Sequence, residues 1–333
     1  MVRVLSLRRQ RLGGMATLST ALAAALEPHG VEMVVDDAAD WIPDKTGFGV
    51  DRQVSKLVRD AAKGFDLVHA WGYRTAWACS EAFGLGFPWV YSAYDWPKTT
   101  STQLIDRLNT ARAGLCPTRA TKNHLEDADT LNLELIDPGV APKNFETTKE
   151  EARRKLDLPA DRPLAAVIAK CDKDSGVEAA VAAIDELSRD RPDCGLVLAG
   201  VGPDAEVVQR HHDGERVWSL EGYVDVPMVL RAVDLLVVTK RRAAFSMVAL
   251  EAMAVGTPVL LRRVGGLPDM GVEDLSVALF DRDEDLAGVI GGLFNAPHFL
   301  ESLADSARTR AADWYGIDES AYRHARLYKE ILR

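Results

Sequence analysis

Short runs of β-branched and apolar residues alternate with longer stretches of helical periodicity along the first part of the chain. The first helical stretch has an apolar residue every three or four positions from Met15 to Leu26, which gives one buried stripe, and Pro28 with Gly30 ends it. Such an alternation favours parallel strands joined by helices. The predicted elements, in chain order, are Val2–Leu7 (strand), Met15–Leu26 (helix), Val31–Val35 (strand), Val54–Ala62 (helix), Leu67–Ala70 (strand) and Trp89–Ala93 (strand).

A second series of the same kind opens after a predicted strand at Leu133–Ile136 and a turn-rich, charged stretch. We therefore predict two doubly wound α/β domains, residues 1–148 and 149–305, with a boundary near Thr148, and a helical segment over residues 306–333. The length of 333 residues agrees, because one hydrophobic core seldom grows beyond about 300 residues. The second series comprises Leu164–Ala169 (strand), Val177–Leu187 (helix), Gly195–Ala199 (strand), Trp218–Leu220 (strand), Pro227–Ala232 (helix) and Leu235–Val238 (strand).

Charge and composition exclude several classes of protein. The net charge of −10 gives no overall electrostatic support for binding nucleic acid. We find no apolar run long enough to span a bilayer and no leader peptide. The four cysteines lie far apart without a C-x-x-C pair, which is typical of buried thiols in a reducing compartment, so we predict a cytoplasmic protein. The cysteines are Cys79, Cys116, Cys171 and Cys194.

A pair of glycines, Gly13-Gly14, stands between the first strand and the first helix, where an open α/β sheet binds ligands. Glycine lets backbone N–H groups approach an anion, and a helix N-terminus favours negative charge. The pair alone is weak evidence, because most such pairs only form a turn. The turn lacks the G-x-G-x-x-G pattern of dinucleotide-binding proteins, and the chain lacks the G-x-x-x-x-G-K-S/T pattern of P-loop NTPases. The sequence therefore does not favour either class.

The strongest motif is the block Leu250–Val259, L-E-A-M-A-V-G-T-P-V, followed by Gly265-Gly266-Leu267-Pro268-Asp269. It resembles the donor-binding region of glycosyltransferase family 4, whose usual form is E-G-F-G-L-x-x-L-E-A-M-A-x-G-x-P-V and then G-G-x-P-E. Further pieces match in the family's order and carry the resemblance from Gly13 to about Tyr328. They are Gly13-Gly14, Asp66–Ala70, Pro138–Val140, Leu198–Pro203 and Gly222–Val224.

The resemblance implies a GT-B fold, in which two Rossmann-like domains face a central cleft with the acceptor on the N-terminal side. It implies a retaining, metal-independent transfer from a nucleoside diphosphate sugar, without a cofactor, and C-terminal helices that cross back to the N-terminal domain. The residues agree in part, since a helix beginning near Ser246 offers free N–H groups to a diphosphate and Glu251 lies within reach of ribose hydroxyls. The predicted donor-binding residues are Gly13, Gly14, Lys170, Gly202, Phe245, Ser246, Met247, Val248 and Glu251, and Tyr94 and Asp95 are on the acceptor side.

Several positions depart from the family pattern. Ala243 stands where the family has a sugar-contacting glutamate, Ser175 where it has a phosphate-binding lysine, and Tyr94 where it has a histidine. Nearby arginines could restore the positive charge. These candidates are Arg241, Arg242 and Arg262, although surface ion pairs are an equally good explanation of them.

Two functions therefore remain open from the sequence. One is a glycosyltransferase with an unknown acceptor and no assigned catalytic residue. The other is a non-catalytic relative that senses a nucleotide sugar or serves as a partner subunit for an active transferase, because the losses at Ala243, Ser175 and Tyr94 touch catalysis more than nucleotide binding. The sequence does not specify the base, the sugar, the acceptor or the oligomeric state.

Overall fold

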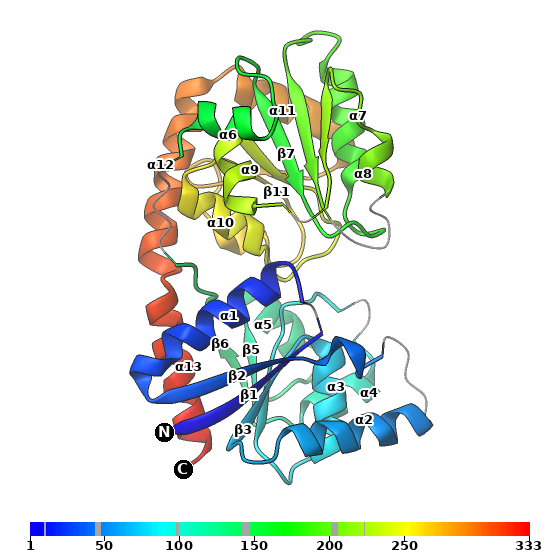
Figure 1. Ribbon diagram of the computed structural model, residues 1–333, viewed down its shortest axis with the longest axis vertical. Coiled ribbons are helices and arrows are strands. Elements are labelled where there is room, and N and C mark those ends of the chain that lie inside the picture. Colours follow the sequence, from blue (N-terminus) through cyan, green and yellow to red (C-terminus); the bar gives the residue numbers. More distant parts are fainter. Residues whose placement is uncertain (10, 44–47, 98–99, 142–146, 201–205, 223) are drawn as a thin grey trace. The chain divides into compact units, whose positions relative to one another are not determined.

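The chain forms two compact units, seen in a computed structural model that describes residues 1–9, 11–43, 48–97, 100–141, 147–200, 206–222 and 224–333. Unit 1 consists of Met1–Ala141 together with Tyr315–Arg333, and unit 2 consists of Pro142–Trp314. Each unit contains a six-stranded parallel sheet (Figure 1). This architecture confirms the predicted α/β class with two doubly wound domains.

Unit 1 has the strand order β2-β1-β3-β4-β5-β6. One face of its sheet packs against α2 and α3, whereas α1 and α13 pack against each other. Its strands are β1 (Val2–Arg8), β2 (Val31–Asp37), β3 (Leu67–Trp71), β4 (Trp89–Ser92), β5 (Ala113–Cys116) and β6 (Leu133–Leu135). Its helices are α1 (Gly14–Leu26), α2 (Phe48–Ala61), α3 (Tyr73–Phe83), α4 (Thr102–Leu108), α5 (Arg119–Glu126) and α13 (Ile317–Ile331).

Unit 2 has the strand order β12-β11-β10-β7-β8-β9. Successive residues of its first strand enter different cores, because Ala165 packs with the side chains of one face and Ala166 with those of the other. Its strands are β7 (Leu164–Ile168), β8 (Gly195–Ala199), β9 (Val217–Leu220), β10 (Leu235–Val238), β11 (Val259–Arg262) and β12 (Ala278–Phe280). Its helices are α6 (Lys149–Lys155), α7 (Val177–Leu187), α8 (Glu206–Arg210), α9 (Val226–Ala232), α10 (Met247–Val255), α11 (Leu286–Phe294) and α12 (Pro297–Trp314).

The chain passes between the units at positions that differ from the predicted boundaries at 148 and 305. Residues up to Ala141 stay with unit 1, because the N–H of Val140 donates to the carbonyl of Tyr315 and the N–H of Ile317 donates to Val140. Thr148 instead begins α6 as its N-cap. Helix α12 remains in unit 2, where it packs against α10, so the chain returns to unit 1 at Tyr315.

Strand order also locates the place in each sheet where ligands bind in doubly wound folds. The chain leads from β7 to β8 in one direction along the sheet and from β10 to β11 in the other, so the strand order reverses between β7 and β10. The corresponding point in unit 1 lies between β1 and β3. Such switch points form crevices that hold ligands in open α/β sheets.

Candidate functional site

The loops that follow β7 and β10 meet at the switch point of unit 2. The hydroxyl of Thr239 donates to the carbonyl of Ser175 at 2.7 Å, and the N–H of Arg241 donates to the carbonyl of Asp174 at 3.0 Å. A Cβ atom added to Gly176 would lie 2.3 Å from the Thr239 carbonyl oxygen, so only glycine allows this close approach. The two loops are thus held together by one side-chain hydrogen bond, one backbone hydrogen bond and the close approach of Gly176 to Thr239.

Lys170 lies at the start of the loop after β7 and is exposed. Within the described part of the chain its ammonium group makes no ion pair. It is therefore available to an anionic ligand at the switch point, as its predicted role requires. Gly202, in the loop after β8, lies outside the described residues.

Helix α10 begins where the sequence predicted. Ser246 is its N-cap in extended conformation, and the Ser246 hydroxyl accepts a hydrogen bond from the N–H of Ala249 at 3.3 Å. The N–H groups of Met247 and Val248 belong to the first turn and have no partner within the helix. Because this N-terminus also carries the positive end of the helix dipole, it suits a phosphate group. The side chain of Phe245 just before it is buried.

Glu251 is the one charged side chain of α10, whose sequence is M-V-A-L-E-A-M-A-V. Its side chain is only 7% exposed, among apolar neighbours on the same helix. Burying a carboxylate costs free energy unless polar groups compensate for the lost water. Glu251 interacts with other groups of the protein, and its place about one and a half turns into α10 keeps it the predicted candidate for accepting hydrogen bonds from ribose hydroxyls.

The three arginines proposed to stabilise phosphate all form ion pairs. Arg262 is buried, donates to the Thr239 carbonyl at 3.0 Å, lies over the Phe280 ring and pairs with Asp283. Arg241 also pairs with Asp283, at 2.9 Å. Burial opposes ionisation of Asp283, but the hydrogen bonds and charges of the two arginines outweigh it and lower the pKa of this carboxyl. Arg242 pairs with Asp174 at 2.6 Å.

These pairs bear out the second explanation that the sequence offered for the three arginines, namely ion pairs. The Asp283 carboxylate binds Arg241 and Arg262, while Asp281 pairs with Arg263 at 2.9 Å. Arg262 is a structural cation, since every interaction described for it is internal to unit 2. The sequence did not reveal this because the partner carboxylates lie in distant loops.

Ala243 and Ser175, the departures from the family pattern, are both buried in unit 2. The carbonyl of Ala243 accepts a hydrogen bond from the N–H of Gly266 at 3.0 Å, which joins the loop after β10 to the Gly265-Gly266 turn. The side chain of Ala243 is 5% exposed. A glutamate there would have to displace its neighbours, so the surroundings have adapted to a small residue.

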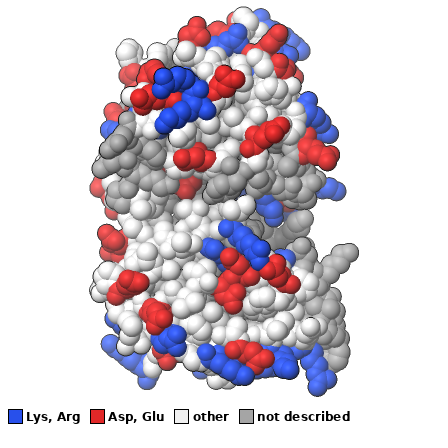
Figure 2. Space-filling view, viewed as in Figure 1, with Lys and Arg blue, Asp and Glu red and all other residues white. Residues whose placement is uncertain are grey.

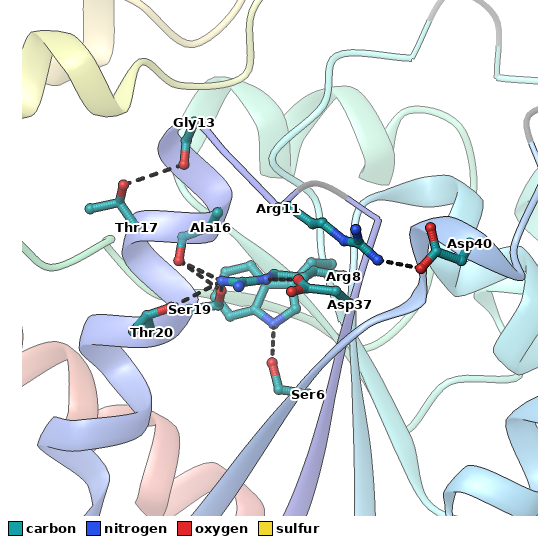
Figure 3. A network of polar contacts seen from close by, with 11 residues as sticks. Ser6, Arg8, Arg11, Gly13, Ala16, Thr17, Ser19, Thr20, Asp37 and Asp40 are labelled. Atoms are coloured by element: carbon teal, nitrogen blue, oxygen red, sulfur yellow. Dashed lines mark hydrogen bonds and ion pairs between the residues drawn. The ribbon is translucent and has the colours of Figure 1, made fainter. Parts of the chain in front are cut away.

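The Gly13-Gly14 pair begins α1 in unit 1. Gly13 is the N-cap, with φ near +93°, a conformation that disfavours side chains, and no side chain caps this helix. Arg8 holds the helix start in another way, because its guanidinium donates to the Ala16 carbonyl at 2.7 Å and to the hydroxyls of Ser19 and Thr20 (Figure 3). The sequence analysis missed this buried arginine.

Arg8 also pairs with Asp37 at 2.6 Å, and these residues are register partners at the ends of β1 and β2. The guanidinium thus joins two strands to the first turns of α1. Arg11, in the loop between β1 and α1, points away from this network towards Asp40 (Figure 3). The helix start of unit 1 is therefore fixed by internal charges.

Tyr94 and Asp95 follow β4 at the carboxyl edge of unit 1. Burial raises the pKa of Tyr94 well above its usual value, and the charge of Asp137 acts in the same direction, so the phenol stays protonated at neutral pH. A Cβ atom on Gly72 would lie 2.6 Å from Oδ2 of Asp95, which places this carboxylate at the N-terminus of α3. The Tyr94 ring is 5.6 Å from that of Trp71.

Behind this edge lies a buried polar chain that the sequence analysis only partly anticipated. His69 was expected to support the end of the sheet. Its Nδ1 atom lies 2.7 Å from the hydroxyl of Tyr328 on α13, and its Nε2 atom lies 2.7 Å from the hydroxyl of Ser92. His69 is also stacked on Trp71, with ring centroids 4.5 Å apart. This chain connects α13 to the strands that carry Tyr94 and Asp95.

Other classes of site find little support in the described residues. None of them form a group of three or more His, Cys, Asp or Glu side chains able to hold a metal ion. On the face drawn in Figure 2, Lys and Arg side chains are interspersed with Asp and Glu rather than gathered in one basic area. No helix in the described ranges is long and apolar enough to cross a membrane. The four cysteines are free and buried.

Residues 162–295 match the family model described as glycosyl transferases group 1. A similar curated protein is a D-inositol 3-phosphate glycosyltransferase from Segniliparus rotundus, 28% identical over 189 residues, which are 53% of this chain and 42% of that relative. This chain thus spans less than half of that relative's length. The match confirms the predicted resemblance to glycosyltransferases.

Solved structures agree on the fold. The sucrose-phosphate synthase structure from Thermosynechococcus elongatus superposes with a TM-score of 0.84 at 21% identity, covering 99% of each chain. HepE from Anabaena, solved in complex with UDP-glucose, superposes with a TM-score of 0.79 at 17% identity, covering 99% of this chain and 100% of HepE. Together with the two six-stranded sheets, these likenesses confirm the predicted GT-B fold.

Proposed function

We propose that this protein transfers a sugar from a nucleoside diphosphate sugar to an acceptor that remains to be identified. The observation that carries the proposal is the arrangement at the switch point of unit 2, where the loop that carries Lys170 contacts the loop that leads into α10. An anion at this point meets N–H groups and a cation together. The names of the similar proteins support a transferase that acts on sugars.

In this proposal each part of the donor has its own partners. The N–H groups of Met247 and Val248 and the ammonium group of Lys170 bind the diphosphate, and Glu251 accepts hydrogen bonds from the ribose hydroxyls. Within unit 1, Gly13 and Gly14 are the proposed donor-binding residues, and Tyr94 and Asp95 are the proposed acceptor-side residues. Positioning and neutralisation of the leaving diphosphate supply most of the rate, without a metal or cofactor. We further propose retention of anomeric configuration and a cytoplasmic location, the latter from the four free cysteines.

Calorimetric titration with UDP-glucose, GDP-glucose and ADP-glucose tests the donor. We expect one of them to bind and to be hydrolysed slowly when no acceptor is present. D-inositol 3-phosphate is the first acceptor to add, because the similar protein bears its name. Transfer in the presence of EDTA supports independence from metal, and the anomeric proton coupling of the product tests retention. Absence of binding by all three donors contradicts the proposal.

A second function is favoured by the buried side chain of Ala243. If the protein only senses a nucleotide sugar, the donor binds but neither hydrolysis nor transfer exceeds the rate without protein. Binding of UDP-glucose by the wild-type protein with release of UDP over hours, faster than in the same buffer without protein, supports the enzyme. Binding without release supports the sensor.

A further inference from the structure

Arg242 differs from the buried Arg262 near the proposed donor site, and unlike Arg241 it does not share its carboxylate partner with Arg262. Arg262 has a 7% exposed side chain and is held by Asp283, by a carbonyl group and by the Phe280 ring. Arg242 is 33% exposed and its partner Asp174 is 38% exposed. An ion pair at such exposure stabilises a fold only slightly, so it can open at little cost.

Opening the Arg242–Asp174 pair leaves the surrounding loops in place. The backbone of Asp174 is fixed independently, because its carbonyl accepts from the N–H of Arg241 and its N–H donates to the Asp172 carboxylate at 3.0 Å. The adjacent Thr239–Ser175 hydrogen bond and the close approach of Gly176 also involve no atom of the Arg242 side chain. The Arg242 guanidinium can therefore change partner without a change in backbone.

The Arg242–Asp174 pair lies where a ligand of unit 2 is expected to bind. Asp174 belongs to the loop after β7 and Arg242 to the loop after β10, so their ion pair lies at the switch point of unit 2. The same loop carries Lys170, whose ammonium group makes no ion pair within the described residues, and ends at the open start of α7 at Gly176. The Arg242 guanidinium pairs with a carboxylate in this structure, and a phosphate group would bind it more strongly.

We propose that the Arg242 guanidinium pairs with the Asp174 carboxylate in the absence of donor and with a phosphate group when a nucleoside diphosphate binds. Arg242 thus transfers from Asp174 to the diphosphate. This inference rests on the proposed function and deepens it. Arg242 thereby becomes a donor-binding residue supplied by the loop after β10. Asp174 becomes an internal competitor that sets donor affinity.

The test is calorimetric titration of three variants with UDP, with ADP and GDP as further probes. Arg242→Gln removes the cation and is expected to weaken binding about tenfold, the equivalent of one charge-assisted hydrogen bond. Asp174→Asn removes the competitor and is expected to tighten binding about threefold. Arg282→Gln is the matched control, because it removes the same charge from an exposed arginine that pairs with Asp285.

The outcomes separate this inference from the proposed function. Uridine lacks phosphate, so the wild type and Arg242→Gln are expected to bind it with nearly equal affinity. A general structural defect would instead weaken the binding of uridine and of UDP alike. If the wild type binds UDP but Arg242→Gln binds it as tightly as Arg282→Gln does, the inference is wrong and the proposed function stands. If Asp174→Asn weakens UDP binding as much as Arg242→Gln, Asp174 is no competitor. If the wild type binds none of the three nucleotides, the proposed function itself fails.

Discussion

Glu251 is the residue that the sequence predicts to accept hydrogen bonds from the ribose of the donor. It is the single charged side chain in an otherwise apolar helix and is nearly fully buried. We predict that Glu251→Gln weakens binding of a nucleoside diphosphate by ~1–3 kcal/mol, because an amide accepts hydrogen bonds from ribose less strongly than a carboxylate does. Calorimetric titration of wild type and variant with UDP measures the effect.

A second readout identifies the ribose as the contact. The wild type is expected to bind UDP more tightly than its 2′-deoxy analogue, and Glu251→Gln is expected to lose most of this preference. The exposed Glu186 on α7 provides the matched control, since Glu186→Gln makes the same chemical change away from the loops of the site. Equal preference in wild type and Glu251→Gln removes Glu251 from the ribose site.

At this scale the sequence predicted residue types better than residue partners. The cap at Ser246 follows from local pattern, because a helix start is encoded within a few residues, whereas the burial of Glu251 was not predicted. The pairing of Arg242 with Asp174 joins residues 68 positions apart, and that of Arg262 with Asp283 joins residues 21 apart. Such contacts depend on which loops the sheet brings together, so the arginines could be listed as cations but not sorted into structural and available ones.

At the scale of elements, α13 is attached to unit 1 through polar as well as apolar groups. Tyr328 is fully buried and its hydroxyl meets Nδ1 of His69, while Lys329 donates to the carbonyl of His29 at 2.7 Å. A Cβ atom on Gly139 would lie 2.6 Å from the Cα of Ile317, so the segment after β6 packs closely on the start of α13. The last helix is thus an integral part of unit 1.

We predict that Tyr328→Phe lowers the free energy of unfolding of unit 1 by ~1–3 kcal/mol. The phenyl ring keeps the apolar contacts, but Nδ1 of His69 is left buried without its hydroxyl partner. Urea unfolding followed by circular dichroism measures the loss. Tyr322→Phe, on the same helix with a side chain 49% exposed, is expected to change stability by less than about 0.5 kcal/mol. Equal effects of the two variants contradict the role given to the Tyr328 hydroxyl.

Most elements could be predicted from hydrophobic pattern, and the exceptions have physical causes. Helix α7 and strand β8 have the predicted bounds because alternation and periodicity are strong there. Helix α2 begins at Phe48, earlier than the predicted Val54, because Gly49 and Asp51 interrupt the pattern at its start. The crossing points at Ala141 and Tyr315 were missed because hydrogen bonds between Val140 and residues of the C-terminal segment determine them.

At the scale of the whole molecule, acid stability depends on two buried histidines that tie α13 to the sheet of unit 1. Burial lowers the pKa of His324 to about 4. The hydrogen bond from Nδ1 to the Ser320 carbonyl raises this pKa, and the charge of the neighbouring Arg323 lowers it further. Burial also lowers the pKa of His69 well below its usual value, with a further contribution from His324. Both imidazoles are therefore neutral in the folded protein at neutral pH.

The sign of the pH dependence follows from proton binding. Below about pH 6.5 the unfolded chain takes up protons at these histidines while the folded protein does not, so stability is lost as the pH falls from there towards 4. His324 alone accounts for on the order of 3 kcal/mol over this range. We predict that the melting temperature falls between pH 7 and pH 4.5 and that His324→Asn, which is less stable at neutral pH, shows a smaller fall. Scanning calorimetry of both proteins across this range measures the difference. The exposed His298 supplies the control, because His298→Asn is expected to show the same fall of melting temperature with pH as the wild type. If His324→Asn and the wild type show equal falls, His324 does not take up a proton on unfolding and the prediction is wrong.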